Sequence, residues 1–370
     1  MSPLTVGVEE ELHIVSRKSG RLVSAAAAVL AGDHPVDLVG AIKGEMPLSQ
    51  IEITTPVCTS LYDVDRSLSR LRAAASERAK QAGCFLVASG TPFSGSPIGQ
   101  VVAATPRYER ISENIRSLVD EHLTAAAHVH VGIADPDDGV AVVNSSRVWL
   151  PTLVSLTANS PYWFSRQTGF ASWRTVHRWR WPISGPPPFS ATTHAYFSRV
   201  ERLVQSRALP DPSMVYWDVR LSLRHPTVEF RIADTPLTVP ETSMLAGLVR
   251  ALAQTVIESR RCGLNQADDI EPELLRAALY CAARDGLEAS LPNPQNASLQ
   301  ISAAESVRLL IRYVAEALRA EDDYDRVVET AEMILADGVG ATRQLRLVQC
   351  KTQVQAARAM ADEMIRGCSD

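Results

Sequence analysis

Polar residues recur at every second position inside four otherwise apolar segments of the chain. The first of these is Gly7-Val8-Glu9-Glu10-Glu11-Leu12, which is typical of a strand. Because successive side chains of a strand point to opposite faces, Glu9 and Glu11 are predicted to share one face. Glu10 is predicted to point the other way and to be structural. The other three segments place on one face Gln50 with Glu52 and Thr54, His128 with His130, and Glu229 with Arg231.

The spacing of apolar residues, Gly and Pro predicts the remaining elements. Strands are expected over residues 5–15, 21–23, 50–54, 84–88, 127–133, 215–220 and 226–233. Helices are expected over residues 61–82, 107–124, 139–160, 241–260, 271–284, 303–320, 322–336 and 345–366. Residues 161–190 are rich in Trp and Arg and are predicted to form an ordered loop that covers something.

This order of elements, with strands in the first two-thirds and helices at the end, predicts an α+β fold. Its sheet is expected to be mainly antiparallel and surrounded by helices. We expect a single catalytic domain over residues 1–370, with a mostly helical portion over about 241–370.

The four polar faces carry the chemistry of a binding site more than that of a solvated sheet. Lysine, the usual residue on exposed strands, is missing from all four, which carry carboxylates, imidazoles, an amide and a guanidinium instead. Glu9 and Glu11 repel each other unless a cation neutralises them, and hard oxygen ligands suit Mg²⁺ or Mn²⁺. We therefore expect a concave surface lined by Glu and His that holds a divalent metal.

Two other functions fit part of this pattern. The pair His128 and His130 also suits a zinc-dependent hydrolase, for which His194 is a distant candidate third ligand. A non-catalytic nucleotide-binding protein that has kept the fold is the other alternative. The Arg and Trp cluster at 173–181 favours an anion clamp over nucleic-acid stacking, because Arg binds carboxylate and phosphate in a bidentate manner. The nearest Gly-rich phosphate-loop candidate, Gly338 to Gln344, is more typical of a helix C-cap.

Composition narrows the class of partner. The net charge of −5 gives no general attraction to nucleic acid or to an anionic membrane. No apolar run approaches the roughly 20 residues of a membrane span, and Met1 to Leu4 do not begin a signal peptide. The six cysteines are scattered, which indicates reduced thiols and a cytoplasmic protein. The last two predicted helices are amphipathic enough for a subunit interface, so a homo-oligomer is also expected.

The ordered set of motifs resembles the bacterial carboxylate–amine ligase family, also called glutamate–cysteine ligase type 2. The motifs that carry the resemblance are Gly7 to Leu12, Gln50 to Pro56, His128 to Ile133, Ala158 to Pro161, Arg180 to Pro182 with Gly185 and Pro186, Trp217 to Arg220, and Glu229 to Arg231. They extend from about residue 5 to the region of Arg343 and so cover nearly the whole chain.

The resemblance implies a fold like that of the glutamine synthetase and guanidino kinase superfamily, in which an antiparallel sheet curves into an open funnel with helices outside. It implies ATP, Mg²⁺ or Mn²⁺, a small-molecule carboxylate and an amine. ATP would phosphorylate the carboxylate to an acyl phosphate, and the amine would then displace phosphate to form an amide. The resemblance leaves the acid and the amine open.

The resemblance also assigns roles to individual residues. The implied metal ligands are Glu9, Glu11, Glu52, His128 and Glu229. The implied catalytic residues are Arg231, Glu52 and Glu229. ATP would be bound by Arg231, His130 and Arg343, and substrate carboxylates by Arg174, Arg180 and Arg220. Among these, Arg231 would meet the transferred phosphoryl group.

Overall fold

A computed structural model describes residues 3–31, 40–97, 100–264 and 270–368. Within these residues, seven strands form the main sheet, in the order β10-β11-β5-β1-β3-β2, with β4 paired to the last residues of β1. These strands are β1 (Val6–Ser16), β2 (Ala41–Gly44), β3 (Gln50–Thr54), β4 (Cys84–Val87), β5 (Ala126–Gly132), β10 (Val219–Leu221) and β11 (Thr227–Asp234). All of their pairings are antiparallel, which confirms the predicted fold class.

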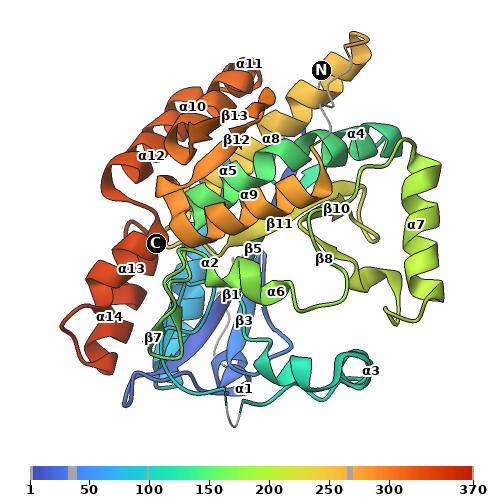
Figure 1. The fold of residues 1–370 in the computed structure, drawn as a ribbon. Coiled ribbons are helices and arrows are strands. Elements are labelled where there is room, and N and C mark those ends of the chain that lie inside the picture. The colour runs from blue at the N-terminus through green and yellow to red at the C-terminus, as the bar shows by residue number, and fades with distance from the viewer. Residues whose placement is uncertain (1–2, 32–39, 98–99, 265–269, 369–370) are drawn as a thin grey trace.

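Helices surround this sheet (Figure 1). The earlier ones are α1 (Ala26–Leu30), α2 (Leu61–Gln81), α3 (Pro106–Ile115), α4 (Pro136–Ser146), α5 (Leu150–Thr157), α6 (Trp173–Arg178) and α7 (Thr193–Gln205). The later ones are α8 (Val239–Arg261), α9 (Pro272–Asp285), α10 (Ala303–Tyr313), α11 (Ala315–Ala320), α12 (Tyr324–Asp337), α13 (Gly340–Val348) and α14 (Gln353–Met364). Short 3₁₀ turns cover Arg116–Glu121, Arg147–Trp149, Pro212–Met214 and Gly286–Glu288.

Strand register determines which polar side chains meet on the open face of the sheet. In β1, Glu9 lies opposite Thr54 of β3 and opposite His128 of β5. Glu11, two residues further along, lies opposite Glu52. Because neighbouring strands are about 5 Å apart, this register brings side chains from distant parts of the sequence into contact.

The opposite face of the sheet is packed against helices, and Glu10 belongs to it. The Glu10 carboxylate accepts hydrogen bonds of 2.8 and 2.7 Å from Arg72 of α2, and both side chains are fully buried. It also accepts a hydrogen bond of 2.5 Å from the hydroxyl of Thr242 in α8. Glu10 therefore points away from the other two glutamates of its run, as predicted, and joins the sheet to two helices.

Most predicted elements are present, but several are divided. The predicted strand 215–220 is interrupted at Asp218, because Tyr216 and Trp217 pair in parallel with β8 (Ser184–Gly185) whereas β10 pairs with β11. The predicted helix 345–366 consists of α13 and α14, separated at Cys350, which has a positive φ of 58°. The predicted helix 303–320 consists of two helices, α10 and α11, which meet at Val314. The segment 21–23 contributes a single bridge between Leu22 and Val15.

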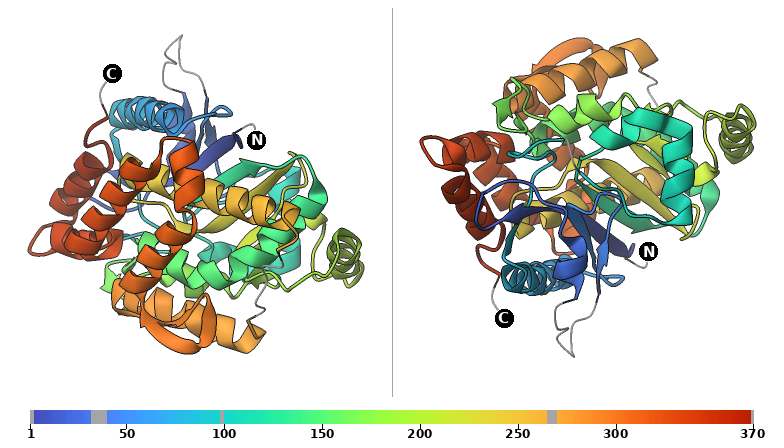
Figure 2. Two further views of the ribbon diagram at one scale, coloured as in Figure 1. Left: turned by 90° about the horizontal axis from the view of Figure 1, so that it is seen from above. Right: turned by 90° about the horizontal axis from the view of Figure 1, so that it is seen from below.

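Some elements were not predicted. They are α1, β2, α7 and the hairpin of β12 (Ser290–Asn293) and β13 (Asn296–Ser302). Helix α7, yellow-green in Figure 2, stands out from the rest of the molecule. The predicted ordered loop 161–190 consists of short elements, namely β6 (Tyr162–Trp163), β7 (Arg166–Gln167), α6 and β8, and β8 pairs with β9 (Tyr216–Trp217).

The C-terminal helices pack on their own chain. The apolar side of α14, which includes Ala357 and Met360, joins a small buried cluster with Phe85 and Val87 of β4. Figure 1 shows α13 and α14 together beside the end marked C. This side of α14 is thus covered within the chain, and the predicted homo-oligomer stays a prediction. None of the helices that the structure describes combines the length and the apolarity that a bilayer span requires.

Candidate active site

The open face of the sheet forms the floor of an open cavity of about 280 Å³. The wall residues on the central strands are Glu9, Glu11, Glu52, His128, His130, Arg220, Glu229 and Arg231. Helix α3 contributes Arg107 and Tyr108, and the segment after β10 contributes Arg224 and His225. Each of the four polar faces predicted from the sequence therefore contributes to one cavity, although Gln50 and Thr54 on the face of β3 are not among the residues that line it.

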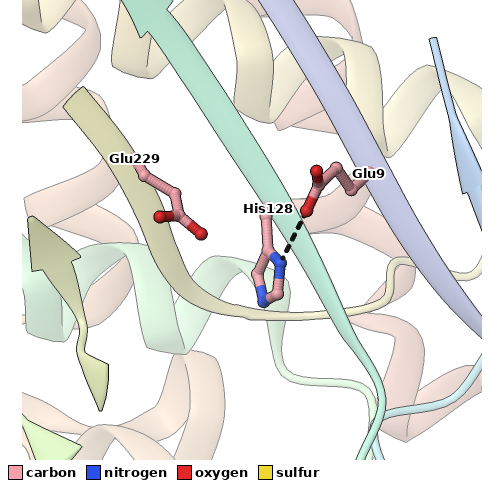
Figure 3. A group of neighbouring side chains, drawn as sticks. All are labelled: Glu9, His128 and Glu229. Carbon is pink, nitrogen blue, oxygen red and sulfur yellow. Dashed lines mark hydrogen bonds and ion pairs between the residues drawn. The ribbon is translucent and has the colours of Figure 1, made fainter. Parts of the chain in front are cut away.

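Three of these residues are arranged as ligands of a metal ion would be. One ligand atom each from Glu9, His128 and Glu229 lies within 4.8 Å of the others. Figure 3 shows the three side chains extending toward one another from β1, β5 and β11. His128 Nδ1 is 3.3 Å from a Glu9 carboxylate oxygen, so a proton on Nδ1 leaves Nε2 with a free lone pair.

Burial and charge together determine the ionisation of this group. Burial raises the pKa of Glu9, but the hydrogen bond from His128 and the positive charge that both imidazoles can carry outweigh it and lower the pKa to about 2. Burial, together with the nearby Arg231, lowers the pKa of His128 to about 3. At neutral pH the pair is a carboxylate and a neutral imidazole, which are the forms that bind a divalent cation.

The Glu229 carboxylate also accepts hydrogen bonds from two arginines. Arg220 Nε donates to one Glu229 oxygen at 2.8 Å, and the guanidinium of Arg231 donates to the other. Burial raises the pKa of Glu229, but Arg231 and Arg220 lower it well below its usual range. His130 Nε2 is 3.9 Å from Glu229 Oε1 and 3.9 Å from Glu9 Oε1. Burial lowers the pKa of His130. One carboxylate thus fixes the two arginines at the cavity wall.

The other carboxylates of the site are crowded. Burial and the charges of Glu45 and Glu52 raise the pKa of Glu11 to about 8. Burial and the charges of Glu9 and Glu45 raise the pKa of Glu52 to about 7. The Glu11 carboxylate accepts a hydrogen bond of 2.8 Å from the backbone N–H of Ala126. This end of the cavity has more carboxylates than cationic side chains, and a bound Mg²⁺ would offset that excess of negative charge.

Sequence reasoning missed Lys43, Glu45, Tyr108, Tyr216, His122 and Trp181 in the cavity wall. Lys43 and Glu45 lie on β2 and just after it, and the short exposed segment Ala41–Gly44 has too little alternation to signal a strand. The sequence signal available for Glu45 was its position seven residues before Glu52.

Arg174 lies in a smaller recess behind the cavity. It is buried, and its guanidinium donates to the backbone carbonyls of Ile232 at 3.0 Å and of Arg231 at 2.9 Å. Those carbonyls are exposed by an irregularity of the β11–β5 ladder between Phe230 and Ala233. Arg174 therefore supports the backbone that carries Arg231, and its Nε remains without a hydrogen-bond partner.

Three predicted site residues lie elsewhere. Arg180 pairs with Glu121 and contacts His177. Arg343 pairs with Glu241 of α8, and Gly338 before it ends α12 with a φ of 91°, as a C-cap does. His194 is on α7, where its Nε2 is 3.4 Å from the Ser198 hydroxyl. None of the three is among the described residues that line the cavity.

Comparison with known proteins identifies the family. The family described as glutamate–cysteine ligase family 2 (GCS2) matches residues 5–368. A Saccharopolyspora erythraea protein named "Putative glutamate–cysteine ligase 2-2" is 37% identical over 349 residues, which cover 92% of this chain and 87% of the relative. A Streptomyces coelicolor protein named "Putative glutamate–cysteine ligase 2" is 37% identical over 349 residues, or 93% of this chain and 94% of the relative.

Solved structures share the fold at low sequence identity. Glutamate–cysteine ligase from Francisella tularensis, in complex with AMP, has a TM-score of 0.72 and 14% identity, over 98% of this chain and 89% of that one. A bifunctional glutathione synthetase from Pasteurella multocida has a TM-score of 0.68 and 14% identity, over 99% of this chain and 53% of that one. The extent of the family match and the identity to these relatives show that the chain belongs to glutamate–cysteine ligase family 2.

Proposed function

We propose that the protein joins a small-molecule carboxylate to an amine by way of an acyl phosphate. Its family makes it an ATP-dependent ligase that forms carbon–nitrogen bonds. The observation that carries the finer proposal is the meeting of carboxylates, imidazoles and arginines from β1, β3, β5, β10 and β11 in one cavity. The names of the relatives suggest glutamate and cysteine as the first substrates to test.

The carboxylates and the imidazole fit a hard divalent cation. Glu9, His128 and Glu229 present their ligand atoms close together, and Glu11 and Glu52 are crowded without a full complement of positive charge. These five residues would hold Mg²⁺ or Mn²⁺, which supplies charge that binds ATP phosphates and stabilises the transferred phosphoryl group.

Chemically, an oxygen of the substrate carboxylate attacks the γ-phosphorus of ATP, the bond to the bridging oxygen breaks, and ADP leaves. The amine nitrogen then attacks the acyl carbon, loses a proton, and displaces phosphate. Arg231, held by Glu229 and by its supported backbone, offers a fixed cation to the phosphoryl oxygens. Arg220 and His130 line the same cavity as Arg231.

The arginines in and near the cavity indicate where the substrate binds. Arg220 faces the cavity, so we propose that it binds a carboxylate directly. Arg174 lines the inner recess, its two terminal nitrogens are bonded to backbone carbonyls of β11, and its buried Nε has no hydrogen-bond partner. We therefore propose that its Nε side contacts the acid. Arg180 and Arg343 stay predictions as ligands, because reaching the cavity would require each to leave its acidic partner.

The reaction is tested by incubating the protein with ATP, Mg²⁺ and panels of acids and amines. We expect ADP and phosphate to be released only when both an acid and an amine are present. If the acid is labelled with ¹⁸O in its carboxylate, one labelled oxygen should appear in the phosphate, because that oxygen bridges carbon and phosphorus in the acyl phosphate. Release that needs no acid, or phosphate without label from a productive pair, would contradict the mechanism.

Metal removal separates the ligase from a zinc hydrolase. We expect EDTA to abolish turnover, because the crowded carboxylates then lack their cation, and Mg²⁺ or Mn²⁺ to restore it. Zinc analysis of the purified protein is expected to find less than one equivalent. One tightly bound zinc per chain, with hydrolysis that needs no ATP, would favour a hydrolase at His128 and His130 instead.

A further inference from the structure

Lys43 reaches Glu52, one of the crowded carboxylates, from the edge of the sheet. It lies on β2 directly opposite Glu52 of β3, and its Nζ is 2.8 Å from Glu52 Oε1. The same Glu52 oxygen accepts a hydrogen bond of 3.0 Å from the Thr54 hydroxyl. One oxygen of a proposed metal ligand is therefore engaged by an ammonium group before any metal is considered.

The exposure of the two partners differs greatly. The Lys43 side chain is 51% exposed, whereas that of Glu52 is 9% exposed. Lysine carries a compact charge on a long flexible stem, and solvent next to it leaves room for another rotamer. Glu52 is fixed inside the cavity wall, so Lys43 is the partner that can leave.

The surrounding charges make this position attractive to a cation. Glu9 and Glu45 act on the Lys43 ammonium along with Glu52, and the net effect raises the pKa of Lys43 despite its partial burial. Two of the cavity arginines, Arg220 and Arg231, contact Glu229 at the other end of the wall. Lys43 thus offsets part of the negative charge at the end where Glu11 and Glu52 are crowded.

We propose that Lys43 is an exchangeable counter-cation: it neutralises Glu52 in the metal-free protein and withdraws when a divalent cation binds there. This rests on the proposed function in one respect, namely that Glu52 is a metal ligand. The ion pair must be broken before Glu52 can bind metal fully, so Lys43 lowers the affinity of the site for metal while stabilising the metal-free fold.

The test measures Mn²⁺ binding by electron paramagnetic resonance of the free ion, without substrates or turnover. We expect Lys43→Met to bind Mn²⁺ about two- to fivefold more tightly than the wild type, the range that corresponds to a partly exposed ion pair. Lys43→Arg, which keeps the charge, should bind less tightly than Lys43→Met. The metal-free Lys43→Met protein should melt at a lower temperature than the wild type, and saturating Mn²⁺ should narrow that gap.

Two further variants make the result specific. Lys80→Met removes another lysine that pairs with a glutamate, Glu77, on the surface of α2, and its Mn²⁺ affinity should equal that of the wild type. In a Glu52→Gln background, Lys43→Met should change Mn²⁺ affinity less than it does in the wild type, because the carboxylate that pairs directly with Lys43 is absent.

The outcomes separate the two proposals. If Lys43→Met binds Mn²⁺ with unchanged or weaker affinity while Glu52→Gln weakens binding, the counter-cation proposal is overturned and the metal site stands. If neither Glu52→Gln nor Glu9→Gln changes Mn²⁺ binding, the metal site itself is wrong, and the role of Lys43 is overturned with it.

Discussion

Replacing Glu229 with glutamine is expected to reduce ligase turnover by roughly 10²–10³-fold, the range seen when a preorganised electrostatic partner is removed from an active site. The Glu229 carboxylate accepts from Arg220 on one oxygen and from Arg231 on the other. Glutamine has one acceptor oxygen and an NH₂ group that cannot accept, so one arginine loses its anchor. The variant also removes a charge from the group that includes Glu9 and His128.

The two losses are expected to appear in different measurements. Loss of a proposed metal ligand should raise the Mg²⁺ concentration needed for half-maximal rate, whereas loss of the anchor for Arg231 should lower the rate at saturating Mg²⁺. Glu329→Gln is the matched control, because Glu329 is exposed on α12 and lies outside the cavity wall; it should leave both quantities unchanged. Turnover within tenfold of the wild type in Glu229→Gln would remove Glu229 from the active site.

Replacing Glu10 with glutamine should act on stability, although Glu10 is next to two proposed ligands in sequence. The Glu10 and Arg72 side chains are 0% exposed and form two hydrogen bonds with each other. Removing one charge of a buried pair leaves the other uncompensated, which costs about 3–5 kcal/mol in the free energy of unfolding. Urea denaturation of Glu10→Gln should show this loss.

The same variant tests the register of β1. Turnover per folded molecule should stay near that of the wild type, because Glu10 faces α2 and α8 and not the cavity. Should Glu10→Gln fail to fold, Thr242→Val tests the same face more gently, since it removes one hydrogen bond to Glu10. A variant with normal stability and lost turnover would mean that Glu10, and not Glu9 or Glu11, faces the metal.

The central strands of the site could be predicted because their chemistry is local in sequence. Period-two alternation alone places Glu9 with Glu11 and apart from Glu10, and the structure confirms both statements. The same rule found His128 and Glu229, which the register of β5 and β11 brings next to β1. The fold class followed from these strands and from the run of helices after them.

Other parts of the site depend on contacts that no local pattern encodes. Lys43 matters only because β2 pairs with β3, and a four-residue exposed strand carries little signal. The family resemblance assigned Arg174 to the substrate carboxylates. Its bonds to the β11 carbonyls arise from a ladder irregularity that the sequence does not reveal. The single-domain assignment, the roles of Arg180 and Arg343, and the cytoplasmic location stay predictions.

The guanidinium of Arg72 has a consequence for how the chain folds as it is synthesised. Besides Glu10, it donates to the carbonyls of Pro236 and Leu237 and to that of Met364, near the last described residue. This buried cation therefore gains its full set of partners only after Met364 has left the ribosome. Until then this buried charge behind the cavity face of the sheet is incompletely paired, so the N-terminal strands do not reach their final stability early.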